Sequence, residues 1–247
     1  MCNVTPIATL ADNFTYVLDD GATAIVIDAG EASPVLRRLD ECSLNLTAIL
    51  ATHAHFDHTG GAEELARRTG GQVVGVVQGA SGTAFRYDVG SFAFHVLPTP
   101  GHSNDSVSYY LPGAGEDPGA VFTGDTLFVG GCGRVFTRSP EKMWSSLQLL
   151  GGLPPGTRVY CGHDYSLEDY EFAATIEPDN PLVKRRLEEI RSLVESGGLT
   201  VPSTIGQERA TNPFLRASTQ EMKRALGMPD ASDAETFATL RRLKDRF

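Results

Sequence analysis

The chain has 247 residues, of which 41% are hydrophobic and 21% charged, and its formal net charge is −10. The hydrophobic share is sufficient for a packed core and argues against disorder, and the negative charge disfavours nucleic acid as a partner. No apolar run reaches the roughly 18 residues that a membrane span needs, and the first residues lack the basic and apolar segments of a signal peptide, so we expect a cytoplasmic protein.

The first 130 or so residues alternate short strand-like segments with helical ones. Residues 14–30 are expected to form two strands joined at Asp20-Gly21, a pair that is favoured in hairpin turns. Ser33 and Pro34 predict the start of a helix, with Ser33 as the N-cap and Pro34 at the first helical position.

Further strands are predicted in apolar runs bounded by Gly and Pro, at residues 46–52, 72–77, 91–101, 106–113, 119–129 and 157–162. A short helix is predicted at residues 61–71, where two glycines end it. A second helix is predicted at residues 139–152, with Ser139 as the N-cap and Pro140 at its start.

From residue 167 to the end, the pattern predicts a mostly helical segment, with the sequence NPFLR at 212–216 in a connection. Four apolar residues repeat at helical spacing and are expected on one helix face: Val183, Leu187, Ile190 and Val194. Three serines precede an acidic residue by three positions, as in a helix capping box: Ser166, Ser218 and Ser232. A mixed α/β domain is therefore expected to carry a helical C-terminal domain.

Three of the six histidines and one aspartate lie within residues 53–58, where a predicted strand ends and a loop begins. His53 and His55 are two positions apart, so on an extended backbone their side chains point the same way. Asp57 and His58 follow in the loop, and imidazole nitrogens with carboxylate oxygens are ligands for zinc or a similar divalent ion. A polar loop whose histidines only make hydrogen bonds is the alternative, but four potential ligands in six residues favour a metal site.

One loop cannot complete such a site, so further ligands are expected at the ends of later strands. Three candidates each follow an apolar run and stand next to a glycine: His102, Asp125 and His163. Taken alone, each of them is more often a turn residue than a ligand. His95 lies in the middle of a predicted strand and is expected to be an ordinary strand residue.

In this order, the motifs THxHxDH, PGH, GD and GH resemble the metallo-β-lactamase superfamily, which implies an αββα sandwich with two metal ions at one edge of the paired sheets. Further motifs resemble one branch of it, glyoxalase II (hydroxyacylglutathione hydrolase): DNFTYVL, FTGDTLFVGGCGR, VYCGHDY, NPFLR and the terminal RRLKDRF. The resemblance extends over essentially the whole chain. It implies a catalytic domain at residues 1–166 and a smaller, helical, substrate-binding domain at residues 167–247.

The resemblance also implies a ligand set for two divalent ions, for which we expect zinc, with iron or manganese as alternatives. One ion would be held by His53, His55 and His102, the other by Asp57, His58 and His163, and Asp125 would bridge them. Asp28 would lie behind the ligands and support them.

The implied activity is hydrolysis of the thioester S-D-lactoylglutathione to D-lactate and glutathione, in methylglyoxal detoxification. A hydroxide between the metals would attack the thioester carbonyl, and Asp57 would orient that hydroxide. Four residues match family positions that contact the substrate: Arg134, Tyr165, Arg241 and Lys244. We expect no nucleic-acid, membrane or subunit partner, and therefore a monomer.

Three departures from the family pattern fall near the implied site. Asp105 and Ser106 replace a glycine and a histidine after His102, and Phe136 stands where some members have a tyrosine. The motif GHDY is slightly similar to the persulfide dioxygenase branch, which uses one iron and glutathione persulfide, and this is the alternative activity. A non-catalytic binding protein on the same scaffold is a second alternative, although every ligand position is filled.

The four cysteines have no CxxC spacing, so we expect reduced thiols: Cys2, Cys42, Cys132 and Cys161. Cys132 and Cys161 stand close in sequence to implied ligands, and thiolates are good zinc ligands. We nevertheless expect both to be structural, because the implied ligand set is complete without them.

Overall fold

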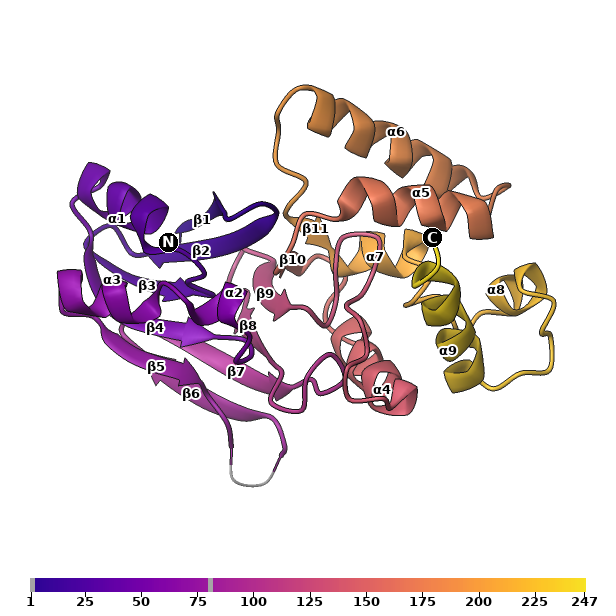
Figure 1. The fold of residues 1–247 in the computed structure, drawn as a ribbon, viewed down its shortest axis with the longest axis horizontal. Coiled ribbons are helices and arrows are strands. Elements are labelled where there is room, and N and C mark those ends of the chain that lie inside the picture. Colours follow the sequence, from indigo (N-terminus) through magenta and orange to yellow (C-terminus); the bar gives the residue numbers. More distant parts are fainter. Residues whose placement is uncertain (1–2, 80–81) are drawn as a thin grey trace.

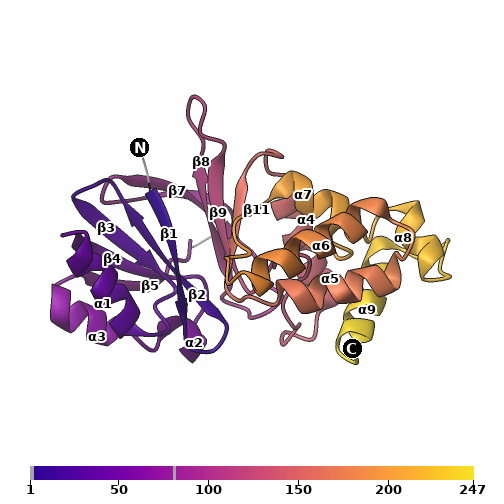
Figure 2. The same ribbon diagram turned by 90° about the horizontal axis from the view of Figure 1, so that it is seen from above.

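Two β-sheets pack face to face, with helices on their outer faces, in the computed structural model, which describes residues 3–79 and 82–247 (Figures 1 and 2). The first sheet has the order β1-β2-β3-β4-β5, with β1 (Asn3–Thr9), β2 (Asn13–Asp19), β3 (Thr23–Ile27), β4 (Asn45–Ala51) and β5 (Gln72–Val76). Its first three strands are antiparallel, whereas β3, β4 and β5 are parallel.

The second sheet has the order β11-β10-β9-β8-β7-β6. Its strands are β6 (Phe85–Val89), β7 (Phe92–Pro98), β8 (Val107–Pro112), β9 (Gly119–Gly124), β10 (Arg158–Cys161) and β11 (Ser203–Thr204). Only the β9–β10 pair among these is parallel, so β7, β9 and β10 all run in the same direction.

The helices form two groups. Near the first sheet lie α1 (Ala32–Glu41), the single turn α2 (Phe56–Thr59) and α3 (Ala62–Thr69). Beside the second sheet lie α4 (Pro140–Gly151), α5 (Ser166–Ile176), α6 (Pro181–Glu195), α7 (Ile205–Thr211), α8 (Gln220–Ala225) and α9 (Asp233–Lys244) (Figure 2). None of these helices, in the part of the chain that the structure describes, is long and apolar enough to cross a membrane.

Side chains alternate between the two faces of each sheet, and this alternation forms the layers of the sandwich. In β2, Tyr16 and Leu18 point into the core between the sheets, where they join Phe122 of β9. Val17 points the other way, into a cluster with residues of α1 and α3. On the outer face of the second sheet, Val121 belongs to a cluster with side chains of α4 and α9. This arrangement confirms the predicted αββα sandwich.

Two helix starts were predicted correctly. Ser139 caps α4, with its side chain accepting from the Lys142 amide at 3.4 Å, and Pro140 is the first helical residue. Ser232 forms the expected capping box with Glu235 at the start of α9. The hairpin at Asp20-Gly21 is also confirmed, between β2 and β3.

Three other serine caps were predicted wrongly. α1 begins at Ala32, one residue before Ser33, and Glu31 occupies the cap position without a side-chain cap. Ser166 is itself the first residue of α5, and its hydroxyl donates to Thr200 at 2.8 Å. At α8 the cap is Thr219, which accepts from the Met222 amide, and not the neighbouring Ser218.

Other differences concern strands and burial. The strands β1, β6 and β11 were not predicted, and the strand expected at 119–129 ends at Gly124. Val183, Leu187 and Ile190 are buried on α6 as expected, whereas Val194 is exposed. His95 lies in β7, as expected for an ordinary strand residue. Cys2 lies outside the described residues, and the other three cysteines are free.

Four strand ends meet at one edge of the sandwich, which places the candidate site. Loops follow β4, β7, β9 and β10 there, and backbone hydrogen bonds join them. Val107 donates to the Thr52 carbonyl at 2.8 Å, and Gly162 donates to the Gly124 carbonyl at 2.9 Å. Phe14 of β2 in turn donates to the Gly162 carbonyl at 2.8 Å, so loops of both sheets are held together.

Candidate metal centre and active site

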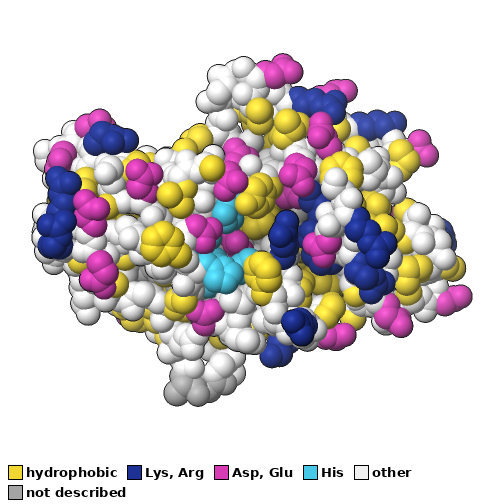
Figure 3. Space-filling view, viewed as in Figure 1, with side chains coloured by type: hydrophobic (Ala, Val, Ile, Leu, Met, Phe, Trp, Pro, Cys, Tyr) yellow, Lys and Arg dark blue, Asp and Glu magenta, His cyan; other side chains and the backbone are white. Residues whose placement is uncertain are grey.

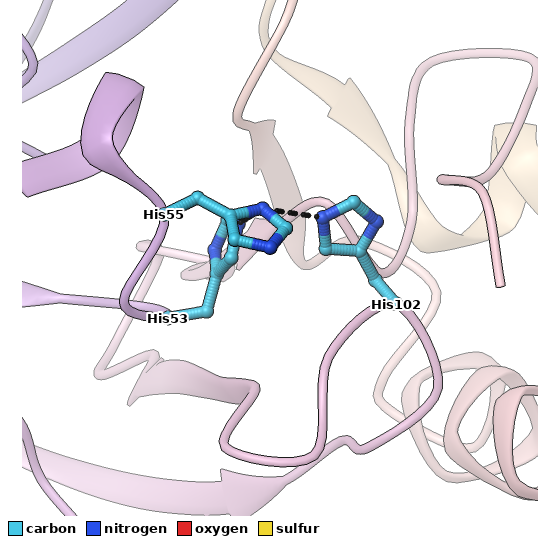
Figure 4. Close-up of side chains that lie close together, drawn as sticks. All are labelled: His53, His55 and His102. Carbon is cyan, nitrogen blue, oxygen red and sulfur yellow. Dashed lines mark hydrogen bonds between the residues drawn. The ribbon is translucent and has the colours of Figure 1, made fainter. Parts of the chain in front are cut away.

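Three histidines form the first group of candidate ligands. His53 and His55 come from the loop after β4, and His102 comes from the loop after β7 (Figure 4). Nδ1 of His55 lies 3.0 Å from Nε2 of His53 and 3.0 Å from Nε2 of His102. The three ring nitrogens therefore converge on one point.

The hydrogen bonds behind these rings fix which nitrogen carries a proton. Nδ1 of His102 lies 3.0 Å from the Arg134 carbonyl and must donate to it. Thr52 donates its hydroxyl to Asp28 at 2.8 Å, so it accepts from Nδ1 of His53 at 3.1 Å. The Nε2 atoms of His53 and His102 consequently present lone pairs to the centre of the group.

The imidazoles of His53 and His102 are neutral at neutral pH. Burial lowers the pKa of His53 to about 4, and burial also lowers the pKa of His102. A proton on His55 could satisfy only one of the two facing lone pairs, whereas a divalent cation satisfies all three nitrogens. The donor set of this group therefore fits a metal ion.

Asp57, His58 and His163 form the second group. Oδ2 of Asp57 lies 3.3 Å from Nε2 of His163 and 3.6 Å from Nε2 of His58. The outer nitrogens of both imidazoles face carboxylates. Nδ1 of His58 lies 3.1 Å from Oδ2 of Asp28, and Nδ1 of His163 lies 2.9 Å from Oδ1 of Asp12.

Asp125 lies between the two groups. Its Oδ2 is 3.4 Å from Nε2 of His102 in the first group and 3.4 Å from Nε2 of His163 in the second, and its Oδ1 is 3.3 Å from Nε2 of His58. Burial opposes ionisation of Asp125, but His163 and His58 hold the pKa of its carboxyl well below its usual value. An ionised carboxylate in this position can bind a cation on each side.

Orphaned buried atoms at this centre also fit a metal. Nε2 of His58 and Oδ1 of Asp125 are buried and, although they lie 3.3 Å apart, neither makes a hydrogen bond to any residue in the described ranges. Buried polar atoms normally have partners, because leaving one unpaired costs about 1–3 kcal/mol. Both atoms point toward the shared centre, where a cation would satisfy them.

Two supporting residues were missed by sequence reasoning. Asp12 lies in the turn between β1 and β2, and Asn13, the first residue of β2, donates to Oδ2 of Asp57 at 3.1 Å. Both residues belong to the motif DNFTYVL, which resembles the family sequence but was given no role in the site. Asp28 was expected behind the ligands, and the structure places it against His58 and Thr52.

A cavity of about 490 Å³ extends from the histidines toward the C-terminal helices. His55, His102, Asp125 and His163 line one part of it, and the four predicted substrate contacts line it as well: Arg134, Tyr165, Arg241 and Lys244. In the space-filling view, the histidines lie in a hollow with basic and acidic side chains close by (Figure 3). Tyr165 stacks on the His163 ring, with centroids 4.9 Å apart.

Arg241 and Lys244 are already paired with groups of this chain. Arg241 is buried; it donates to the Cys132 carbonyl at 2.7 Å and pairs with Asp245 at 3.0 Å. Lys244 pairs with Glu168 and lies 3.3 Å from Asp169. Both cations line the cavity, and their acidic partners were not foreseen.

The departures from the family pattern have defined positions. Asp105 accepts from the Ala54 amide at 3.0 Å, and Ser103 donates to Asp105 at 2.6 Å and shares a hydrogen bond with Ser106. These contacts tie the loop of His102 to the loop between His53 and His55. The Phe136 ring lies 5.1 Å from the His102 ring and lines the cavity.

The sandwich and its two groups of candidate ligands define a metal-binding hydrolase of the metallo-β-lactamase superfamily, whose family model matches residues 8–82 and 82–163. Residues 164–247 match the model described as hydroxyacylglutathione hydrolase C-terminus. The "Hydroxyacylglutathione hydrolase" of Methylococcus capsulatus is 42% identical, covering 100% of this chain and 99% of that one. The chain therefore belongs to the hydroxyacylglutathione hydrolase family, glyoxalase II.

Solved structures share the fold. The crystal structure of ETHE1 from Myxococcus xanthus has a TM-score of 0.64 and 27% sequence identity, covering 97% of this chain and 96% of that one. The crystal structure of TTHA1623 in a di-iron-bound form has a TM-score of 0.59 and 26% identity, covering 86% of this chain and 100% of that one.

Proposed function

We propose that this protein hydrolyses S-D-lactoylglutathione to D-lactate and glutathione with two bound zinc ions. One end of the cavity holds two ligand groups that share Asp125, and the same cavity also holds Arg134, Arg241 and Lys244. This arrangement supports a substrate with a reacting carbonyl and a carboxylate some distance from it. Identity of about 42% to a hydroxyacylglutathione hydrolase over the whole chain supports the same substrate.

The proposed ligand sets follow the two groups. His53, His55 and His102 would hold one ion, Asp57, His58 and His163 would hold the other, and Asp125, which lies between the groups, would serve both. When bound, the two ions lower the pKa of a water molecule and polarise a carbonyl, which supplies a nucleophile at neutral pH.

The chain's own residues orient the reactants. Asp57 is partly exposed and held by Asn13, so its carboxylate is placed to accept a hydrogen bond from the attacking water. The water oxygen adds to the thioester carbonyl carbon as a water proton is released to solvent. The carbon–sulfur bond then breaks, and sulfur leaves as a thiolate with its electron pair. A thiolate is a good leaving group, so no dedicated proton donor is required. Burial raises the pKa of Tyr165 to about 12, so its hydroxyl stays protonated and can donate to the substrate.

Further parts of the proposal concern organisation and location. Residues 1–166 would form the catalytic domain and residues 167–247 the substrate-binding domain, since α9 supplies Arg241 and Lys244 to the cavity. The free thiols of Cys42, Cys132 and Cys161 support a cytoplasmic location. The monomeric state stays a prediction.

The test is purification with elemental analysis, followed by two assays. We expect hydrolysis of S-D-lactoylglutathione, which is monitored as the loss of thioester absorbance. We expect no oxygen consumption with glutathione persulfide. The control is Asp125→Ala, which should lose metal and activity together because it removes the shared ligand. Oxygen consumption with the persulfide, without thioester hydrolysis, would establish the dioxygenase alternative instead. A metal-loaded protein inactive in both assays would support a binding protein.

A further inference from the structure

The ammonium of Lys244 is enclosed by its own chain at the cavity wall. Lys244 is the last residue of α9, and only 6% of its side chain is exposed. Its Nζ lies 5.2 Å from the ring centroid of Phe247 and 5.9 Å from that of Phe172. A charge in such surroundings needs a counter-charge, because burial removes its hydration.

Two neighbouring carboxylates in the first turn of α5 provide that counter-charge, and they differ in how freely their side chains can move. Asp169 is buried, and a Cβ atom built on Gly131 would lie 2.1 Å from its Oδ2, so Asp169 is wedged against that glycine. Glu168 pairs with the same ammonium, yet 61% of its side chain is exposed. Glu168 can therefore swing into solvent, whereas Asp169 cannot move without opening the packing.

Asp169, the buried partner, also neutralises the charge of Lys244 incompletely. Burial raises the pKa of Asp169 to about 7, against the opposing effect of Lys244. Arg241, one turn earlier on α9, has its own carboxylate in Asp245 at 3.0 Å. Glu168 is thus the partner that an incoming anion has to replace at Lys244.

We propose that Glu168 is a specificity-determining residue that occupies Lys244 in the empty cavity and is displaced by the terminal carboxylate of the substrate. This inference rests on the proposed function, since it takes a glutathione thioester as the substrate. Pairing with Glu168 keeps the ammonium in place without ligand, and a ligand must compete with it. A carboxylate tail can make that exchange, whereas a neutral tail leaves Glu168 in place and gains nothing from Lys244. The apparent affinity is then the intrinsic affinity multiplied by the fraction of molecules in which Lys244 is free of Glu168, so the competition lowers it.

The experiment compares Glu168→Gln with the wild-type protein and with Glu171→Gln, all metal-loaded. Glu171 is the matched control, because it lies on the same helix, is partly exposed and pairs with Arg191 outside the cavity. Binding of glutathione is measured by calorimetry, and binding of glutathione monoethyl ester, whose glycine carboxylate is blocked, is measured in parallel. We expect Glu168→Gln to bind glutathione about two- to fivefold more tightly, as for release of a partly exposed ion pair. The ester should bind all three proteins equally.

The kinetics should follow the binding. KM for S-D-lactoylglutathione should fall by a similar factor in Glu168→Gln, with kcat within about twofold, because Glu168 is remote from the reacting carbonyl. Unchanged glutathione binding, or no binding to any of the proteins, overturns the inference. Weaker binding also overturns it and indicates instead that Glu168 holds the substrate's ammonium group. Tighter binding without thioester hydrolysis by the wild type would overturn the proposed function alone.

Discussion

The imidazoles of the two ligand groups differ in what supports them. His58 and His163 each face a carboxylate with the outer ring nitrogen, at 3.1 Å from Asp28 and 2.9 Å from Asp12. The outer ring nitrogens of His53 and His102 instead face neutral oxygens, a threonine hydroxyl and a backbone carbonyl. A carboxylate behind a histidine makes the imidazole a stronger ligand. We therefore expect the position of Asp57, His58 and His163 to bind its metal more tightly.

Asp12→Asn tests the role of the less buried of these carboxylates. We expect the affinity for one of the two metal ions to fall about 10- to 100-fold, because His163 loses its charged support. Competition with a chelator, followed by elemental analysis, measures this directly. Asp88→Asn is the control, since Asp88 pairs with Arg86 in β6 and is not among the residues that line the cavity. Equal metal retention in both variants would contradict the assignment.

Cys132 and Cys161 test the completeness of the ligand set. Burial raises the pKa of Cys132 to about 12 and raises that of Cys161 further, so both remain thiols at neutral pH. Thiolate is the form that binds metal. We expect the double variant Cys132→Ser, Cys161→Ser to keep the wild-type metal content, measured by elemental analysis, with lower thermal stability from the buried hydroxyls. Loss of one metal ion from a folded double variant would mean that a thiol is a ligand.

The elements show where sequence patterns were reliable. Ser232 and Ser139 cap helices as predicted, because each directly precedes its helix and bonds a free amide. At α1 the predicted start was wrong. Ala32 is buried against the first sheet, so the helix begins there and Pro34 becomes its third residue. Proline is tolerated at that position because the first four amides of a helix have no partner in it. Propensity alone does not include such packing.

Lys244, in the last turn of α9, is expected to contribute to substrate binding. Lys244→Met keeps the aliphatic packing but removes the ammonium that would hold the substrate carboxylate. Hydrogen bonds to charged groups contribute about 1.5–3 kcal/mol, which corresponds to about 10- to 150-fold in kcat/KM. Because the substrate exchanges with Glu168, we expect a loss in the lower part of that range, roughly 10- to 30-fold, mainly through KM.

Steady-state kinetics on two substrates separate binding from chemistry in this variant. Hydrolysis of a small thioester without glutathione should be nearly unaffected, and metal content should be unchanged. Lys184→Met, on the exposed face of α6, is the control. Equal losses on both thioesters would mean that Lys244 supports the fold or the reaction and not glutathione binding. Arg241 is less suitable for this test, because it also holds the Cys132 carbonyl.

For the whole molecule, the order of the motifs predicted more than their local patterns did. The spacing of THxHxDH, PGH, GD and GH implied a sandwich whose strand ends meet, and His53, His102 and Asp125 do come together across large separations in sequence. Periodicity could not predict the edge strands β1 and β11, because their pairing depends on partners distant in sequence or on only two residues. The acidic partners of Lys244 were also beyond prediction, since Glu168 reaches it only after α5 and α9 are packed.

Metal titration of the chelated protein tests the central claim most directly, with hydrolysis of S-D-lactoylglutathione as the readout. The two ligand groups and their shared Asp125 predict no hydrolysis without metal and a rise that saturates at about two equivalents of zinc per chain. Full activity without metal, or saturation at a single equivalent, would contradict a two-metal glutathione thioesterase.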